Sequence, residues 1–194
     1  MLYVPDIAAA ERNKYDEMWA VPEYADKSPG LDNVERFISV LKPAMGSPMV
    51  DIGCGTGGAG LALQNQHHMR MWWLDISSAA LDPAVPRLRF IKTPLWRQWP
   101  YQIRPAWEYG FCCDVLEHIP TEFTMLSIER IVRACRVSWL QISLVPDVFG
   151  QAIGQTLHLT VRPFRWWLER IAVLGEVIDA RDLISSGLYV VRAR

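Results

Sequence analysis

DIGCGTGG, at residues 51–58, is the stretch that decides the fold. It joins a short apolar run, which predicts a strand at residues 49–51, to a helical pattern at residues 57–66. Glycines at such a junction allow a tight turn and let a ligand approach bare backbone at the start of a helix. Gly53, Gly55 and Gly58 also match the G-x-G-x-x-G spacing of dinucleotide-binding loops. The stretch therefore predicts a cofactor loop, with a nicotinamide or flavin dinucleotide as one candidate ligand.

Beyond this loop, short apolar runs alternate with helical segments toward the C-terminus. Further strands are predicted at residues 69–74, 87–91, 109–113 and 137–145, and helices at residues 121–135 and 163–175. The remaining residues have the pattern of a terminal hairpin. Strands that alternate with helices imply an α/β fold with a doubly wound, mainly parallel sheet.

The chain before the first strand predicts two helices separated by a turn. Asp6 is placed to cap a helix that runs to about Trp19, and a turn with prolines and a glycine then ends it. The second helix is expected to begin near Asp32, which has capping-box spacing to Glu35.

Composition places the chain among globular proteins. Its 194 residues are enough for one domain with a buried core, and 51% of them are hydrophobic against 21% charged. No linker or repeat divides the chain. We therefore expect a single domain over residues 1–194, with a helical cap at residues 1–45 and a cofactor-binding α/β core at residues 46–194.

Charge and targeting signals exclude several classes of partner. The formal net charge of −1 indicates no general affinity for nucleic acid or anionic membranes. The first residues, MLYVPDIAAAER, lack the basic region of a signal peptide, and no run reaches the roughly 18 apolar residues of a membrane span. The four cysteines have neither disulfide-scaffold density nor paired C-x-x-C spacing. We therefore expect a reduced, cytoplasmic protein with no membrane partner and no metal site.

The segment at residues 93–108, TPLWRQWPYQIRPAWE, departs from the alternating pattern. Its three prolines exclude a regular helix, and it carries three tryptophans. One interpretation is an aromatic loop that covers one side of the sheet. The other is a loop that shapes a ligand pocket beside the third and fourth strands.

Asp51 distinguishes between two kinds of cofactor. A dinucleotide would place an anionic pyrophosphate against the glycine loop, where a carboxylate repels it. S-adenosylmethionine has no phosphate there and carries an ammonium group and a positive sulfonium, which a carboxylate attracts. The charge of Asp51 thus favours S-adenosylmethionine.

Asp75 ends the second predicted strand. A carboxylate at the tip of this strand can accept hydrogen bonds from both ribose hydroxyls of an adenosine cofactor. The alternative is an exposed aspartate that only caps a helix starting near Ser77.

DIGCGTG at residues 51–57, LDIS at 74–77 and CCDVLEHIP at 112–120 are the motifs by which the sequence resembles class I S-adenosylmethionine-dependent methyltransferases. The resemblance is greatest to small members with a D-V-L-E-H segment after the fourth strand. YDEMWAVPEYADKSPG, at residues 15–30, is also similar to phage-type members of that group. The resemblance covers the chain from Tyr15 to the final hairpin.

The resemblance implies a seven-stranded Rossmann-like sheet whose last strand is antiparallel. It also implies that the glycine loop holds the methionine part of the cofactor, that Asp75 holds the ribose, and that the residues around Asp114 line the methyl group. The cofactor-binding residues expected on this basis are Asp51, Gly53, Cys54, Gly55, Thr56, Gly57, Asp75, Ile76, Thr93 and Asp114.

The adenine contact departs from the family pattern. The family usually has an acidic residue after the third strand, which contacts the adenine amino group. This sequence has Lys92 and Thr93 there. Either Thr93 accepts that hydrogen bond, or Leu95 and Trp96 sandwich the base.

His118 is the candidate catalytic residue. Methyl transfer depends chiefly on positioning in a dry site, so a general base is optional. His118 follows a strand at the edge where ligands bind in such folds, and the ordinary pKa of histidine suits proton removal at neutral pH. Alternatively, Glu117 and His118 only cap the next helix or contact the cofactor. We interpret His158 as a packed or solvated histidine, with a position facing the pocket as the alternative.

The expected function is methyl transfer from S-adenosylmethionine to a small-molecule, nucleotide or saccharide acceptor, because the chain is short, is not basic and carries no added recognition domain. The N-P-P-Y and Pro-Cys motifs of enzymes that methylate DNA bases do not occur in the sequence. The alternatives are a methyltransferase acting on nucleic acid or protein, a dinucleotide-binding oxidoreductase, and a binding protein that holds the cofactor without turnover.

Overall fold

The computed structural model describes residues 6–25, 29–99 and 107–194. Its helices are α1 (Ile7–Met18), α2 (Pro22–Ala25), α3 (Pro29–Leu41), α4 (Gly58–His67), α5 (Thr121–Ala134) and α6 (Phe164–Leu174), with the 3-10 turns η1 (Arg87–Arg89), η2 (Leu116–His118) and η3 (Phe149–Ile153). Its strands are β1 (Pro48–Ile52), β2 (Arg70–Asp75), β3 (Phe90–Lys92), β4 (Trp107–Cys113), β5 (Cys135–Ser143), β6 (Glu176–Asp182) and β7 (Ser186–Arg192). None of the helices in these ranges is long and apolar enough to cross a membrane.

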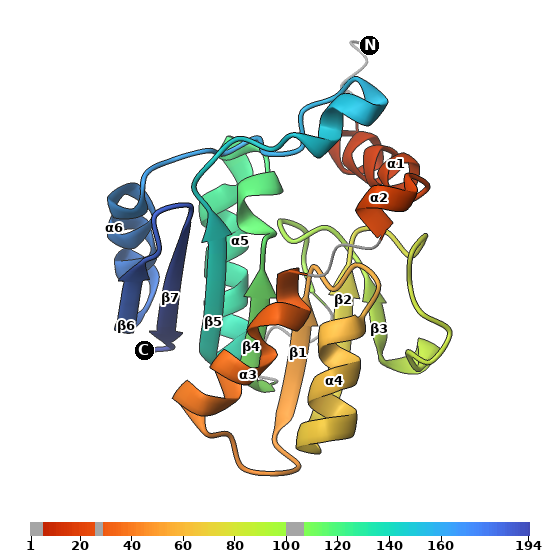
Figure 1. The fold of residues 1–194 in the computed structure, drawn as a ribbon. Coiled ribbons are helices and arrows are strands. Elements are labelled where there is room, and N and C mark those ends of the chain that lie inside the picture. Colours follow the sequence, from red (N-terminus) through yellow and green to blue (C-terminus); the bar gives the residue numbers. More distant parts are fainter. Residues whose placement is uncertain (1–5, 26–28, 100–106) are drawn as a thin grey trace.

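The seven strands of the described ranges form one sheet in the order β3-β2-β1-β4-β5-β7-β6 (Figure 1). Neighbouring strands from β3 to β5 are parallel, whereas β7 is antiparallel to both β5 and β6. The predicted doubly wound, mainly parallel sheet with a C-terminal antiparallel hairpin is therefore confirmed. The strand order reverses between β1 and β4, so the loops that follow these strands open on a shared crevice.

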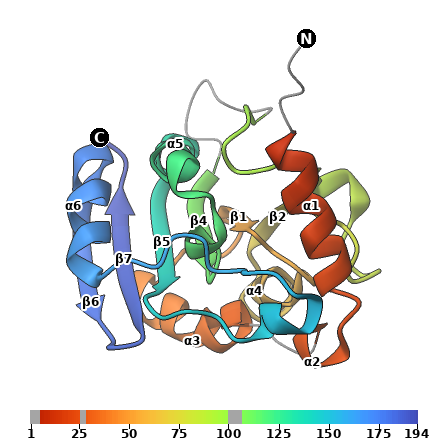
Figure 2. The same cartoon turned by 90° about the horizontal axis from the view of Figure 1, so that it is seen from above.

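Helices cover both faces of the sheet. α3 and α4 lie on one face, and α5 and α6 lie on the other (Figure 2). Successive residues of a strand point to opposite faces. Met49 of β1 accordingly packs in the core shared with α3 and α4, whereas its neighbour Val50 packs in the core shared with α5 and α6. Burial on both faces explains why the strands have near-continuous apolar sequences.

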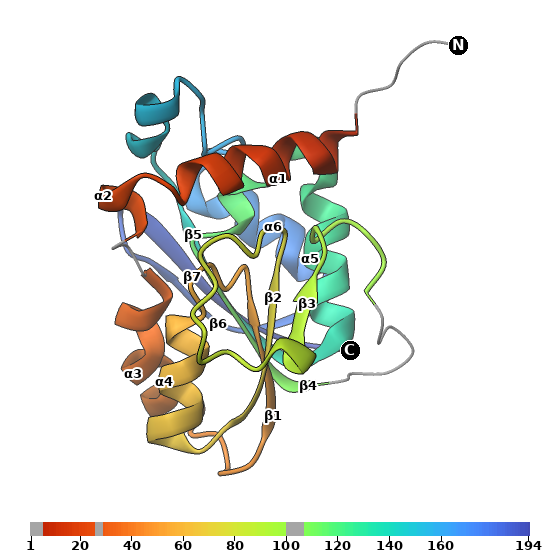
Figure 3. The same ribbon diagram turned by 90° about the vertical axis from the view of Figure 1, so that its right-hand side faces the viewer.

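α1 lies across the carboxyl ends of the strands rather than against a face of the sheet (Figure 3). Asp6 caps it as predicted, since its side chain accepts hydrogen bonds from two backbone N–H groups of the first turn. Ser77, just after β2, donates a hydrogen bond to Asp16 of α1. The Lys14 ammonium lies 3.4 Å from the carbonyl oxygen of Thr156. Contacts with the loop after β2 and with the loop after β5 therefore hold α1 over the edge where ligands bind in such sheets.

Two predicted boundaries are wrong by three residues, and the turn predicted between the first two helices contains the short helix α2. α3 begins at Pro29 rather than near Asp32, because proline is favoured in the first turn of a helix, where its missing N–H is not needed. The third strand begins at Phe90 rather than at Arg87, because a tight turn precedes it, closed by the N–H of Arg89 donating to the carbonyl of Pro86.

The aromatic segment after β3 fulfils both interpretations over residues 93–99. Trp99 is buried in the core, with its ring centroid 6.5 Å from that of Trp107. Trp96 stacks on Phe123 of α5 at 5.2 Å and also faces the cavity described below. Residues 100–106 of the segment lie outside the described residues.

Candidate functional site

A cavity of about 330 Å³ opens at the carboxyl ends of β1, β2 and β4. Its walls come from α1 and α2, the glycine loop, the loop after β3, the segment after β4, and the loop between β5 and α6. In open α/β sheets, this edge is where ligands bind.

The glycine loop forms one wall of the cavity. Gly53, Gly55 and Gly57 have φ angles of 69°, 52° and 84°, in the left-handed region that other residues rarely adopt. A Cβ atom on Gly53 would lie 2.4 Å from Val115, and one on Gly55 would lie 2.7 Å from Trp19. Glycine is therefore required at both positions, and the loop presents bare backbone to the cavity.

Asp75 joins the loops that follow β1 and β2. Its Oδ2 accepts a hydrogen bond from the N–H of Gly55 at 2.9 Å, and its Oδ1 accepts one from the N–H of Ser77 at 2.8 Å. Burial raises the pKa of Asp75, although these hydrogen bonds act to lower it. The alternative of an exposed helix cap is wrong, since the side chain is only 8% exposed and Ser77 begins no helix.

Asp51 lies in β1 beside the start of α4 and is also buried. Its Oδ2 accepts a hydrogen bond from the N–H of Gly60 at 2.9 Å, in the first turn of that helix. Burial raises the pKa of Asp51 to about 7, and the charge of Asp75 contributes in the same direction. Because both carboxylates line the cavity, the site favours a ligand that brings positive charge to this wall.

The other residues predicted to bind a cofactor surround this pair. Those on the cavity wall are Gly53, Cys54, Gly55, Thr56, Ile76, Thr93 and Asp114, and the proposed adenine neighbours Leu95 and Trp96 join them. Gly57 is not among the lining residues. It is the N-cap of α4, and its carbonyl accepts a hydrogen bond from the Trp73 indole at 3.2 Å.

The other half of the cavity is lined by residues from α1, α2, the segment after β4 and the loop after β5: Tyr15, Tyr24, Asp114, His118, Asp147 and His158. Asp114 directly follows β4. Its φ of 55° is a left-handed conformation that is uncommon outside glycine, and such strain is frequent at functional sites. Glu117, in η2, is fully buried, and its Oε1 accepts a hydrogen bond from the N–H of Ser143 at 2.7 Å. Burial, followed by the charge of Asp114, raises the pKa of Glu117.

His118 ends η2 and faces the cavity. Its Nδ1 lies 2.7 Å from the hydroxyl oxygen of Tyr15 in α1. Burial, followed by the charges of His158 and Lys14, lowers the pKa of His118 to about 3. The expectation of an ordinary histidine pKa is therefore wrong, and the ring is neutral at pH 7. The capping alternative is wrong as well, because Pro120 is the N-cap of α5.

His158 lies in the same half of the cavity. Its ring centroid is 4.6 Å from that of His118, with the two rings nearly perpendicular, and its Nδ1 lies 2.7 Å from the carbonyl oxygen of Val145. The interpretation as a merely packed or solvated histidine is wrong, and the alternative of a position facing the pocket is confirmed.

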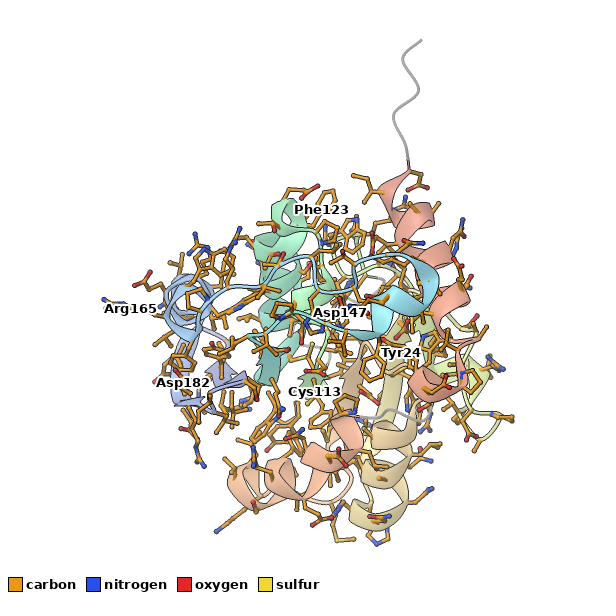
Figure 4. All side chains as sticks on the ribbon, turned by 45° about the horizontal axis from the view of Figure 1, so that its top comes forward. Tyr24, Cys113, Phe123, Asp147, Arg165 and Asp182 are labelled. Carbon is orange, nitrogen blue, oxygen red and sulfur yellow. The ribbon has the colours of Figure 1, made fainter. Side chains whose placement is uncertain are left out.

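Sequence patterns miss the residues that α1, α2 and η3 bring to this half. Tyr24 packs against Trp19 at 4.8 Å and against Phe149 at 6.0 Å between ring centroids. Tyr24 and Asp147 lie over the same edge of the sheet, on segments from opposite parts of the chain (Figure 4). No local sequence spacing predicts that Tyr24 and Asp147 line the cavity, because the two residues come together only when the N-terminal helices pack across the strand ends. The segment YDEMWAVPEYADKSPG, which contains Tyr15, Trp19 and Tyr24, is the signal that could have found the aromatic residues, whereas Asp147 has none.

Solved structures share this architecture. The chain is similar to 1,6-didemethyltoxoflavin-N1-methyltransferase of Burkholderia thailandensis, solved with S-adenosylhomocysteine, at 13% identity and a TM-score of 0.70 over 100% of this chain and 92% of that chain. Magnesium protoporphyrin IX methyltransferase of Synechocystis PCC 6803, also solved with S-adenosylhomocysteine, aligns at 16% identity and a TM-score of 0.61 over 100% and 90%. The fold is that of the Rossmann-like methyltransferases.

The methyltransferase fold also occurs in a protein named for another reaction. The cyclase SpnF aligns at 16% identity and a TM-score of 0.60, over 79% of this chain and 60% of that one. No protein-family model and no curated protein sequence matches the chain. The likeness thus establishes the fold, and the activity must be argued from the residues of the cavity.

Proposed function

We propose that the chain is a class I S-adenosylmethionine-dependent methyltransferase that acts on a small-molecule, nucleotide or saccharide acceptor. The observation that carries the proposal is the hydrogen bond from the N–H of Gly60 to Asp51. It puts the protein's own carboxylate at the helix N-terminus where a dinucleotide would set its pyrophosphate. A cofactor with an ammonium group and a sulfonium is attracted by the same charge.

The half of the cavity lined by the glycine loop, Asp51, Asp75 and Thr93 is called the cofactor half here, and its other contacts support this assignment. A carboxylate has about four acceptor positions, and the backbone N–H groups of Gly55, Ser77 and Ile76 use up to three of those on Asp75. The remaining capacity is available to a ribose hydroxyl. The N–H of Thr93 donates to the carbonyl of Asp75 at 2.9 Å, so the loop after β3 lies beside the ribose position and can enclose the adenine.

We assign the acceptor to the half of the cavity bounded by Tyr15, Tyr24, His118 and Asp147. The whole cavity, which also includes the cofactor half, has a volume of about 330 Å³, near the lower end of small-ligand pockets, which span roughly 300–1,000 Å³. α1 lies over this edge of the sheet, so an acceptor must fit beneath it (Figure 3). These features favour a small acceptor over a folded macromolecule.

The chain's own part in the reaction is to position the acceptor and exclude water. When bound, S-adenosylmethionine supplies an activated methyl group. Tyr15 holds His118 in place, and we propose His118 as the residue that contacts the acceptor and can receive its proton. With a pKa of about 3 it is a weak base, which suits an acceptor whose own proton is readily lost.

The proposal is tested by asking what the protein binds and what it methylates. Mass spectrometry of the protein purified under mild conditions should find S-adenosylmethionine or S-adenosylhomocysteine, and no dinucleotide. Incubation with methyl-labelled S-adenosylmethionine should then label members of a panel of small hydroxyl, amine and carboxylate compounds. Label found only in added RNA or protein would favour the macromolecular alternative, and retained NAD or flavin would contradict the proposal.

A further inference from the structure

Three side chains at the base of the acceptor half form a compact group of potential metal ligands. Glu117, His118 and His158 each offer one ligand atom, and the three atoms all lie within 4.8 Å of one another. Glu117 and His118 are adjacent in η2, whereas His158 comes from the loop between β5 and α6. The group is therefore created by the tertiary fold, which is why the sequence predicts no metal site.

Glu117 is the member of the group that has an unpaired carboxylate oxygen in the described part of the chain. Its side chain is fully buried, and its Oε2 has no hydrogen-bond partner among the described residues. None of the ion pairs within the described ranges involves it, and Lys14, at the same end of the fold, pairs with Glu11 at 2.5 Å. Burying an unpaired carboxylate is strongly unfavourable. A proton or a cation must offset this cost.

The two histidines are held in the way that metal-binding histidines are held. A ligating imidazole usually gives its other ring nitrogen to a backbone carbonyl, a carboxylate or water, which fixes the tautomer. His158 fits this pattern, because its Nδ1 lies 2.7 Å from the carbonyl oxygen of Val145 and its Nε2 is then left with a lone pair. His118 is oriented by the Tyr15 hydroxyl, 2.7 Å from its Nδ1, so its Nε2 is the atom that can face an ion.

We propose that Glu117, His118 and His158 bind one divalent transition-metal ion at the base of the acceptor half of the cavity. Two imidazoles and one carboxylate suit Zn²⁺, Mn²⁺, Fe²⁺ or Co²⁺ better than Mg²⁺ or Ca²⁺, which prefer oxygen ligands throughout. Three protein ligands leave at least one coordination position, and His118 and His158 both face the cavity. The acceptor half is thus suited to a ligand that can bring an oxygen or nitrogen atom to the ion. With an ion bound, both ring nitrogens of His118 are engaged, so the proton-accepting role proposed for His118 belongs to the chain without metal.

The geometry requires a small rearrangement on binding. Ligands about 2.1 Å from a shared ion lie roughly 3.4 Å apart in a tetrahedral site. Atoms that are up to 4.8 Å apart therefore need to close by up to about 1.4 Å, which side-chain rotation can supply. Binding of an ion should consequently draw η2 toward the loop after β5 and raise the melting temperature.

The experiment uses the full chain without a histidine tag, treated with a chelator and then titrated with ZnCl₂ and CoCl₂ by calorimetry. We expect one equivalent of tight binding, a visible absorption band with Co²⁺ and a higher melting temperature with either ion. Glu117→Gln and His158→Ala should each weaken binding by about 100-fold or more, since a direct ligand is lost and even outer partners account for about 10–100-fold. His67→Ala removes a histidine that pairs with Glu35 away from the site, and it should bind like the unmodified chain.

Two results would overturn the proposal. One is the lack of stoichiometric binding to the unmodified chain. The other is binding that Glu117→Gln and His158→Ala leave unchanged. Gln at position 117 can still accept the hydrogen bond from Ser143, so its melting temperature without metal shows whether the variant is folded. If Glu117 holds a proton rather than a cation, the chain gains no stability from metal and Glu117→Gln melts at least as high as the unmodified chain. Either failure leaves cofactor binding, which is measured without metal, untouched.

Discussion

The two halves of the cavity are built in different ways. In the cofactor half, backbone atoms of one glycine loop and two carboxylates at strand ends provide the binding surface, and Gly55 meets Asp75 only 20 residues along the chain. In the acceptor half, side chains from distant segments provide it, and Tyr15 meets His118 across 103 residues. A binding surface made of backbone atoms can therefore be predicted from a short stretch of sequence. A binding surface made of side chains from distant segments forms only when the chain folds.

The largest expected effect separates the two halves by activity. His118→Ala should lower turnover about 10²–10⁴-fold with cofactor affinity little changed, because the ring contacts the acceptor rather than the cofactor. Turnover with a saturating acceptor and calorimetric titration of S-adenosylhomocysteine measure the two quantities on one preparation. His68→Ala, at an exposed position, is the control. Full turnover in His118→Ala would remove this residue from the site.

The next effect probes the cofactor half through Asp75. Asp75→Ala should cost about 1.5–3 kcal/mol of cofactor affinity, since charge-assisted hydrogen bonds to the ribose are lost. The sequence alone suggests that such a tip carboxylate is dispensable for folding. The structure predicts otherwise, because the part-buried N–H of Gly55 and the buried N–H of Ser77 lose their acceptor, which should lower the melting temperature.

Asp82→Ala is the matched control for Asp75. Asp82 is exposed and also accepts a backbone hydrogen bond, from the N–H of Ala84 at 2.7 Å. Its loss should leave cofactor affinity unchanged. If Asp75→Ala also keeps full affinity by calorimetry, then Asp75 only ties the two loops together and does not bind the ribose.

The effect that is smallest per step, at most about 1.4 kcal/mol for each pH unit, is a pH dependence that belongs to the cofactor half. The pKa of Asp51 is about 7 in the folded chain and near 3.8 when unfolded, so between these values only the folded state holds the proton. The contribution of Asp51 is therefore fully present below about pH 4 and is lost as the pH rises through 7, at up to about 1.4 kcal/mol per pH unit.

Denaturant unfolding of the cofactor-free chain across this range tests the sign. Stability should fall more steeply with rising pH in the unmodified chain than in Asp51→Asn, which cannot titrate at this position. S-adenosylhomocysteine should flatten the curve, because its ammonium group favours the ionised carboxylate. Identical pH slopes for the two proteins would show that Asp51 is ionised throughout.

The same contrast explains what the sequence could predict. Clear apolar runs mark the first two strands. The sequence therefore predicts that the glycine loop, Asp51 and Asp75 lie at the ends of these strands, on one edge of the sheet. The alternation of Met49 and Val50 between two cores likewise follows from strand periodicity.

The acceptor half could be predicted only in part. D-V-L-E-H placed His118 at the right edge, but its low pKa comes from burial beneath α1 and from His158, neither of which a spacing reveals. Tyr24 lies within the segment at residues 15–30, but no spacing there places it on the cavity wall, and Asp147 carries no motif. Both line the cavity because α2 and the loop after β5 lie over the strand ends. The lack of a hydrogen-bond partner for Glu117 Oε2 among the described residues likewise depends on which groups surround it after folding.

Thermal unfolding in the presence of each cofactor tests the central claim most directly. S-adenosylmethionine and S-adenosylhomocysteine at about 100 times their dissociation constants should each stabilise the chain by roughly 2.7 kcal/mol. NAD and FAD should produce no shift, because Asp51 already occupies the helix N-terminus that a pyrophosphate needs. A shift with NAD or FAD that exceeds the shift with S-adenosylmethionine would contradict the account.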